Sequence, residues 1–383
     1  MTVFFDYEQL TWPDVAGLSR DTPLVIPLGV GYPLDKLAGA LGNPPQIGLL
    51  PPLPFGWPGS GLTVPAHTIR TILSNLMDSL RDDGFSRVYT LSPQGMNLKL
   101  GASGIALPIM PDRAPLQQQQ LPLDEHEEKV VIIPIGQTEQ HGFHLPLSTD
   151  TLIIDAIAQG TAAAVPVQAV ALPVMPYGVS THRQAFAGTL NCGGRAFEDF
   201  WLSVIDNLVL RGFDRFYLLS GHGGNSSFLT NVVKYAGEHH SRIFCATAWL
   251  YLSGSEGIAA LEKYRLSPIG GMGHACELET SFILHLRPEL VRQDRAVDEM
   301  DFVSTPNYYM DWVEGGALIA NPSWYDDTQT GAYGAGSLAT ADHGRIWLEA
   351  AIHEKISHVA EIHTQHARRE ARRQNGYGYW GKQ

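Results

Sequence analysis

The segment Ile133-Pro-Ile-Gly-Gln-Thr-Glu-Gln-His-Gly-Phe-His-Leu-Pro-Leu-Ser-Thr-Asp150 continues an apolar run that starts at Val130 and is typical of a buried β-strand. It ends where apolar residues at helical spacing begin, over residues 151–164. A strand, a loop and a helix in this order predict an α/β fold with a mainly parallel sheet. Such sheets bind their ligands at the carboxyl ends of the strands, which is where this loop would lie.

The loop contains four side chains that could bind a metal: Glu139, His141, His144 and Asp150. Carboxylates and imidazoles close together are typical ligands of a divalent cation with mixed nitrogen and oxygen coordination. Any one histidine alone could simply be a buried, hydrogen-bonded side chain. Four candidates in one short loop after a strand favour metal binding.

A second cluster follows another apolar run, Phe216-Tyr-Leu-Leu219, and reads Ser220-Gly-His-Gly-Gly-Asn225. Its glycines allow a tight turn and a close approach of the backbone to a ligand. His222 would then lie at the same edge of the sheet as the first cluster. A phosphate-binding loop is the alternative, but no Lys or Arg lies within the loop to compensate phosphate charge.

The third cluster is His274-Ala-Cys-Glu-Leu-Glu-Thr-Ser281, ahead of a helical pattern. Glu277 and Glu279 are two residues apart and cannot share one helix face, so at most one points into a common site. The other would cap the helix or orient a ligand. For Cys276, a small packed side chain is a better interpretation than a nucleophile.

These three clusters closely resemble the motifs of the creatininase family of metal-dependent amidohydrolases, and residues 331–340 resemble its C-terminal signature. The resemblance covers roughly residues 128 to 360. It implies a layered α/β fold with a largely parallel sheet and a site for two divalent metal ions. It further implies the following roles: Glu139 and His222 on one metal, His141 on the other, Asp150 bridging, and His274 as the catalytic proton donor.

One position departs from creatininase itself, which carries a metal-binding glutamate two residues after the histidine of its Gly-His motif. Gly224 occupies that position here. The resemblance is instead to the formamide-cleaving and other branches, in which the glutamate matching Glu277 would supply the missing ligand. Glu279 would then serve catalysis, although the sequence leaves open which of the two glutamates binds metal. Creatinine is therefore a doubtful substrate.

The chemistry that fits is hydrolysis of a C–N bond in a small amide, cyclic amide or formamide by a metal-activated hydroxide. Zn²⁺ is the default ion, with Zn²⁺, Mn²⁺ or Fe²⁺ in the second site. An alternative keeps the metals and hydrolyses a C–C or lactone bond. A non-catalytic binding or assembly module is the less favoured interpretation, because every candidate ligand is retained.

Composition restricts the partners. The chain has 383 residues and a formal net charge of −13, which disfavours nucleic acid and anionic membrane surfaces. No apolar run approaches the roughly 18 residues of a membrane span, and no signal peptide is evident. Three cysteines at unpatterned spacing indicate free thiols in a reducing compartment. We therefore expect a cytoplasmic homo-oligomer that acts on a small molecule.

Residues 1–100 contain an apparent partial copy of residues 128–383, the catalytic domain, joined to it by a Pro- and Gln-rich linker at residues 101–127. Pro23-Leu-Val-Ile-Pro-Leu-Gly29 resembles residues 130–136, and Gly84-Phe-Ser-Arg-Val-Tyr-Thr-Leu-Ser92 resembles residues 212–220. The first copy has lost the candidate ligands: Tyr32, Leu34 and Gln94 stand where the second has Glu139, His141 and His222, whereas Asn97 still matches Asn225.

Two further regions could contribute to a substrate pocket. In the long loop 177–189, His182 or Arg183 could meet a carbonyl or carboxylate group of the substrate. Trp312 or Trp324 could form an aromatic lid that excludes water. A surface role explains His182 or Arg183 equally well, and surface packing or a subunit contact explains the two tryptophans equally well.

Overall fold

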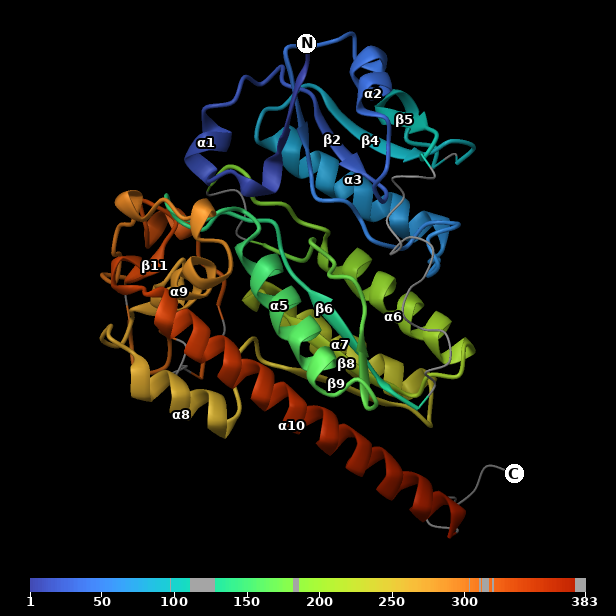
Figure 1. Ribbon diagram of the computed structural model, residues 1–383, viewed down its shortest axis with the longest axis vertical. Helices are drawn as coiled ribbons and strands as arrows, with labels where there is room; N and C mark the ends of the chain where they lie inside the picture. The colour runs from blue at the N-terminus through green and yellow to red at the C-terminus, as the bar shows by residue number, and fades with distance from the viewer. Residues whose placement is uncertain are drawn as a thin grey trace.

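The computed structural model describes residues 1–96, 98–110, 128–181, 186–302, 304–309, 311, 317–318 and 320–375. Asn97, His182, Arg183, Trp312 and most of the predicted linker lie outside these ranges. Two parallel sheets, one from each end of the chain, form the framework (Figure 1). We call residues 1–107 the N-terminal unit and residues 128–375 the C-terminal unit.

The N-terminal unit is built on a five-stranded parallel sheet of order β1-β3-β2-β4-β5. Apolar runs form its central strands, as the sequence predicts for Leu24–Leu28 and Val88–Leu91. The edge strand β5 lies within residues 101–127, the predicted linker, and its side chains Ile105 and Leu107 pack onto the sheet. The strands are β1 (Val3–Asp6), β2 (Leu24–Pro27), β3 (Gln46–Leu49), β4 (Val88–Pro93) and β5 (Gly104–Leu107), and the helices are α1 (Trp12–Ala16), α2 (Leu34–Ala40) and α3 (Ala66–Asp82).

The C-terminal unit contains a four-stranded parallel sheet of order β7-β6-β8-β9. These strands are β6 (Val130–Ile135), β7 (Ala169–Ala171), β8 (Arg215–Ser220) and β9 (Phe244–Ala248). The helices that accompany them are α5 (Thr149–Ala164), α6 (Gly194–Leu210) and α7 (Ser226–His239). Strands β6 and β8 and helix α5 agree with the sequence prediction to within a few residues, because apolar runs and helical spacing are both clear there.

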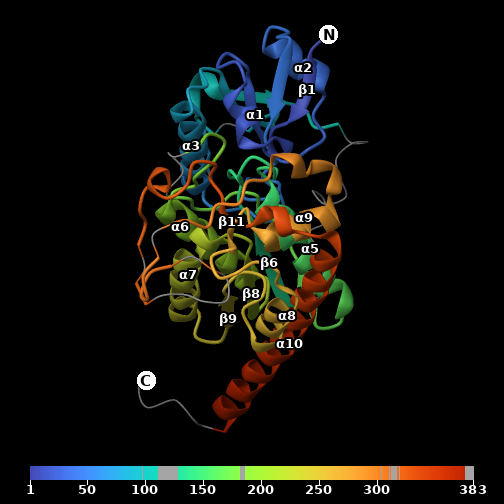
Figure 2. The same cartoon turned by 90° about the vertical axis from the view of Figure 1, so that its left-hand side faces the viewer.

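Alternation of side chains along the strands divides the apolar core between the two faces of this sheet. Val131 and Ile133 of β6 pack with α6 and α7, whereas Val130 and Ile132 pack with α5 and the C-terminal helices. Those helices are α8 (Ser255–Tyr264), α9 (Glu277–Leu286) and α10 (Ala341–Gln374), with a short β-ribbon of β10 (Met272–His274) and β11 (Tyr333–Gly334). Helix α10 extends beyond the rest of the molecule (Figures 1 and 2).

The two units share one hydrophobic core. Side chains of α3, including Ile69 and Leu73, lie in the same buried cluster as Phe197 and Phe200 of α6. The docking of the N-terminal unit through a helix face therefore buries apolar surface on both sides, which a unit of this small size needs for stability. Among the described helices, none combines the length and apolar character needed to span a bilayer.

We expect the shared core to contribute strongly to stability. Leu73 is fully buried in it, so Leu73→Ala should lower the free energy of unfolding by about 2–5 kcal/mol, measured by urea denaturation. The control is Leu210→Ala, because Leu210 is 88% exposed at the end of α6 and should change stability by less than about 0.5 kcal/mol. Equal effects in the two variants would contradict a core formed jointly by α3 and α6.

Candidate metal centre

The loop between β6 and α5 carries the first three candidate ligands into the interior. Glu139 and His141 follow β6, and Asp150 lies in the first turn of α5. The backbone N–H of Glu139 donates to Leu147 O over 3.1 Å, which closes the loop on itself. Gly142 has a φ of 60°, a left-handed conformation that glycine adopts without strain. The negative carboxylate of Asp150 is also favoured at a helix N-terminus.

Glu139, Asp150 and His222 form one group of potential ligand atoms, all within 4.8 Å of one another. His222 Nδ1 lies 3.0 Å from Glu139 Oε1 and 3.3 Å from Asp150 Oδ2. The other ring nitrogen, Nε2, lies 3.1 Å from Val179 O. A carbonyl can only accept, so Nε2 carries a proton, and Nδ1 faces the two carboxylates. Burial opposes charge on this ring, but Glu139 and Asp150 raise the pKa of His222 well above its usual value.

His141, Asp150 and Glu279 form a second group of the same compactness. His141 Nε2 lies 3.1 Å from Asp150 Oδ1. Burial alone would lower the pKa of His141, but the Asp150 carboxylate raises it to about 9. Burial raises the pKa of Glu279 to about 7. Asp150 thus directs one oxygen toward each group, which is the geometry of a bridging carboxylate.

Two buried carboxylate oxygens also favour cation binding at these groups. Glu139 Oε1 and Asp150 Oδ2 are buried carboxylate oxygens that both face His222 Nδ1 and have no other hydrogen-bond partner in the described part of the chain. A buried charge is costly unless it is paired or bound to metal. Divalent ions in these two positions would satisfy both oxygens and would replace the protons that His141 and His222 otherwise hold beside the carboxylates. The donor set, imidazole and carboxylate, fits Zn²⁺ or a similar ion.

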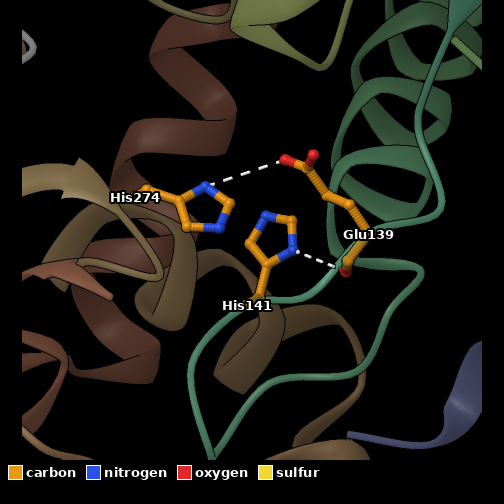
Figure 3. Close-up of side chains that lie close together, drawn as sticks. All are labelled: Glu139, His141 and His274. Carbon is orange, nitrogen blue, oxygen red and sulfur yellow. Dashed lines mark hydrogen bonds and ion pairs between the residues drawn. The ribbon is translucent and has the colours of Figure 1, made fainter. Parts of the chain in front are cut away.

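His274, at the end of β10, lies beside Glu139 and His141 (Figure 3). Its Nε2 is 2.8 Å from the carbonyl oxygen of Gln140, so Nε2 carries the proton. Its Nδ1 is 3.8 Å from Glu139 Oε1, and its ring lies 4.2 Å from the ring of His141. Burial and the nearby His141 lower the pKa of His274 to about 3. The ring is therefore neutral, with the Nδ1 lone pair available near the ligand groups.

The structure places Glu277 outside both ligand groups. Its two carboxylate oxygens accept from the backbone N–H groups of Leu266 and Ser267, at 2.9 and 2.7 Å, and it belongs to neither ligand group. Because α9 begins at Glu277, the two glutamates already lie on different sides of a helix. Glu279 faces the ligand groups, and Glu277 instead fixes the chain that enters the β-ribbon.

The backbone at Gly224 explains why this position holds no glutamate. A Cβ atom there would lie 2.3 Å from Val179 O and 2.4 Å from His222 Nε2. Any side chain would displace the contact that sets the tautomer of His222. The carboxylates of the second group are those of Asp150 and Glu279.

Some neighbouring residues escaped the sequence analysis. Gln140 donates from Nε2 to Gly331 O over 2.9 Å, and Tyr251 donates to Gly221 O over 2.6 Å. Tyr251 follows β9, so its place after a neighbouring strand was a usable signal. The candidate His144 is buried outside both groups and bonds Thr280 Oγ1 at 2.8 Å. All three cysteines are free, as expected.

A separate cavity of about 700 Å³ lies between the two units. Its walls include several prolines, Glu8 of the N-terminal unit and Asp155 of α5. It contains none of the residues of the two ligand groups. The candidate metal centre is therefore distinct from this cavity.

Comparison with known proteins agrees with the geometry. Residues 116–359 match the family described as creatininase, creatinine amidohydrolase. A mycofactocin precursor peptide peptidase of Mycobacterium tuberculosis (strain CDC 1551 / Oshkosh) is 31% identical over 238 residues, 60% of this chain and 84% of that protein. A 3-dehydro-scyllo-inosose hydrolase of Thermotoga maritima is 30% identical over 238 residues, 58% of this chain and 73% of that protein. A creatinine amidohydrolase of Pseudomonas putida is 28% identical over 185 residues, 44% of this chain and 68% of that protein.

Solved structures share the fold of the C-terminal unit. A crystal structure of creatinine amidohydrolase (creatininase) matches with a TM-score of 0.51 and 22% identity, covering 61% of this chain and 90% of that one. Similar structures include a Zn-Zn form of a mutant creatininase and a Mn form. With a family match that spans more than half of the sequence, and with the ligand groups in place, the chain belongs to the creatininase family of hydrolases.

Proposed function

We propose that the protein hydrolyses a C–N bond of a small amide, cyclic amide or formamide with two divalent metal ions. The observation that carries this proposal is the pair of ligand groups that share Asp150 next to a neutral His274. Divalent ions at such a site lower the pKa of bound water and polarise a substrate carbonyl. The relatives named for creatinine and for a precursor peptide support an amide as the substrate class.

The residues around the groups have separable tasks. Glu139 and His222 would hold one ion, His141 and Glu279 the other, with Asp150 between them. We expect Zn²⁺ in one site and Zn²⁺, Mn²⁺ or Fe²⁺ in the second. The bond from His222 Nε2 to Val179 O presents Nδ1 to the first ion, and such orientation by an outer hydrogen bond is common for metal-binding histidines.

His274 is suited to moving one proton. Its Nδ1 is unprotonated at neutral pH, so it first accepts a proton from the attacking water. It then returns that proton to the leaving nitrogen, so that an amine departs rather than an amide anion. The expected role as proton donor is thereby the second half of a cycle that begins with His274 as a base.

A second candidate reaction rests on the relative from Thermotoga maritima. Its named substrate, 3-dehydro-scyllo-inosose, is a carbocyclic ketone, so the same ligand set also fits hydrolysis of a C–C or lactone bond. A panel of cyclic amides, formamides, lactones and carbocyclic ketones, assayed with the Zn²⁺-loaded protein, separates the candidates. A chain inactive on the whole panel would favour the non-catalytic alternative.

We further propose a cytoplasmic homo-oligomer without nucleic-acid or membrane partners.

We also propose that the N-terminal unit is a degenerate partial copy of the catalytic fold. The order β3-β2-β4-β5 corresponds to β7-β6-β8-β9. Matching hydrogen bonds support the alignment: Gly29 N to Leu53 O at 3.0 Å corresponds to Gly136 N to Met175 O at 2.8 Å. The described residues of this unit contribute to no candidate metal group.

The bridging role of Asp150 is tested by metal content. Asp150→Asn should reduce the content from about two ions per chain to well below one, because both sites lose a carboxylate. Inductively coupled plasma analysis of the Zn²⁺-loaded chain measures this. The control is Asp155→Asn, on the same helix but outside both groups. Full metal content in Asp150→Asn would refute the bridge.

The choice between the two glutamates has its own test. Glu279→Gln should retain about one of the two ions, because only the second group loses a ligand. Glu277→Gln should keep the full metal content and lower the melting temperature, since it weakens two hydrogen bonds to backbone, one of them buried. The reverse pattern of metal content would restore Glu277 as the ligand.

The role of His274 is tested by kinetics. His274→Ala should keep the metal content and lower kcat on an amide by roughly 10²- to 10⁴-fold. The loss should be smaller for substrates whose leaving group needs no protonation. His353→Ala, at an exposed histidine, serves as the control. Loss of metal in His274→Ala would instead identify His274 as a ligand, within its own compact group with Glu139 and His141.

A further inference from the structure

The N-terminal unit reaches the edge of the candidate metal centre through Trp12. This residue begins α1, whose first turn is fixed by a capping box between Thr11 and Asp14. The indole N–H donates to Thr330 O over 2.8 Å. Its ring lies 5.3 Å from the ring of Phe143 and 5.2 Å from that of Phe186. One side chain of the N-terminal unit thus contacts three separate segments of the C-terminal unit, which carries the candidate metal centre and is called the catalytic unit below.

Each of these segments adjoins the residues of the centre. Phe143 lies two positions after His141. Thr330 precedes Gly331, whose carbonyl accepts from Gln140 Nε2 at 2.9 Å. The backbone carbonyl of that same glutamine accepts from His274 Nε2. Trp12 is therefore connected to the proton-transferring histidine through a short series of hydrogen bonds and covalent steps.

Aromatic rings continue the contact toward the site. The ring of Phe186 lies 5.2 Å from that of Tyr325, tilted by 45°, and Phe186 shares a buried cluster with Trp324. The ring of Trp324 lies edge-on at 4.7 Å from His274. We call Trp12, Phe186, Trp324 and Tyr325 the aromatic wall. Tyr325 is 64% exposed, so this wall extends from the protein surface to His274.

Helix α3 holds the segment 188–192, which continues from the wall. Asp83, at the end of α3, accepts from Gly188 N at 2.8 Å, and Ser79 accepts from Asn191 N at 3.2 Å. On its other side the segment is bonded to the loop of the metal centre. Gln140 N donates to Thr189 Oγ1 at 3.0 Å, and Leu190 N donates to Thr138 O at 2.9 Å. The segment lies between α3 and the candidate ligands, and bonds to both.

We propose that the N-terminal unit contributes to the active site and that Trp12 is a positioning residue. Trp12 would fix the position of the aromatic wall and so favour substrates with a planar group beside the scissile bond, since aromatic faces stack on planar groups. This inference rests on the proposed hydrolase function for its kinetic consequence. Its structural consequence, the fixing of segment 188–192, is measurable without any substrate.

The kinetic test compares a small formamide with an amide of the same amine that carries an aromatic acyl group. Trp12→Ala in the full, Zn²⁺-loaded chain should raise KM for the aromatic amide on the order of 10-fold, with a smaller change for the formamide. Trp12→Phe keeps the ring and should recover most of this selectivity. Metal content should stay at the level of the unmodified protein.

Trp57→Phe is the matched control, because Trp57 is buried in the core of the same unit and takes no part in the aromatic wall. It should lower stability and leave the ratio of kcat/KM between the two substrates unchanged. A ratio that stays constant in Trp12→Ala, or that moves equally in Trp57→Phe, would overturn the assignment of Trp12.

Hydrogen–deuterium exchange of the Zn²⁺-loaded chain tests the role of α3. Asp83→Ala and Ser79→Ala should each accelerate exchange in peptides that cover residues 187–192, by roughly 10-fold or more, which corresponds to the loss of about 1.4 kcal/mol of protection. Arg81→Ala is the control, because Arg81 lies on the same helix and pairs with the exposed Asp78. Unchanged exchange in both variants would overturn the proposal. A chain without hydrolase activity would refute the proposed function alone, since this measurement would still decide whether α3 fixes the segment.

Discussion

The arrangement of the catalytic unit depends on one buried carboxylate, that of Asp150, which has opposite charge on both sides. One oxygen lies 3.1 Å from His141 Nε2 and the other 3.3 Å from His222 Nδ1. A carboxylate that is 1% exposed would be costly without such partners. Because both oxygens of Asp150 need a partner, the end of β6, the start of α5 and the end of β8 meet at one point. Parallel strands favour this arrangement, because their carboxyl ends already lie at the same edge of the sheet.

The common edge formed by the carboxyl ends of parallel strands also explains how far the sequence could predict the site. Apolar runs located β6 and β8, so the polar residues after them were expected to meet, and Glu139, His141 and His222 do lie together with Asp150. The two glutamates of α9 were not resolved in this way. Their roles depend on where the helix begins, and a shift of one residue rotates every side chain by about 100°. The hydrogen bonds of Glu277 to backbone groups, rather than any motif, place it apart from the ligand groups.

Contacts between the units lay beyond prediction for a different reason. Trp12 and Thr330 are 318 positions apart, and no local pattern relates a tryptophan at a helix start to a distant carbonyl. The docking of α3 on α6 likewise follows from the shapes of two apolar faces, and periodicity shows only that such faces exist. The strands of the N-terminal unit were predictable because burial alone requires their composition. Their use as support for the catalytic loops was not, since it is set by tertiary packing.

Under the proposed duplication, the two units separate what folding requires from what chemistry requires. Both keep the apolar strands, the strand order and the glycine that ends the helix before β4 or β8, with φ of 93° at Gly84 and 96° at Gly212. Those features serve the fold, because the left-handed turn and the buried strands are needed in either copy. The ligands serve only the metals. Where the catalytic unit has Glu139, the first has Tyr32, whose hydroxyl donates to Leu28 O at 2.5 Å. A buried carboxylate without a cation would be destabilising there, whereas a phenol bonded to backbone is not. In a copy that binds no metal, replacing the buried ligands therefore stabilises the fold. The surface of that copy can still pack against the active site of the catalytic unit.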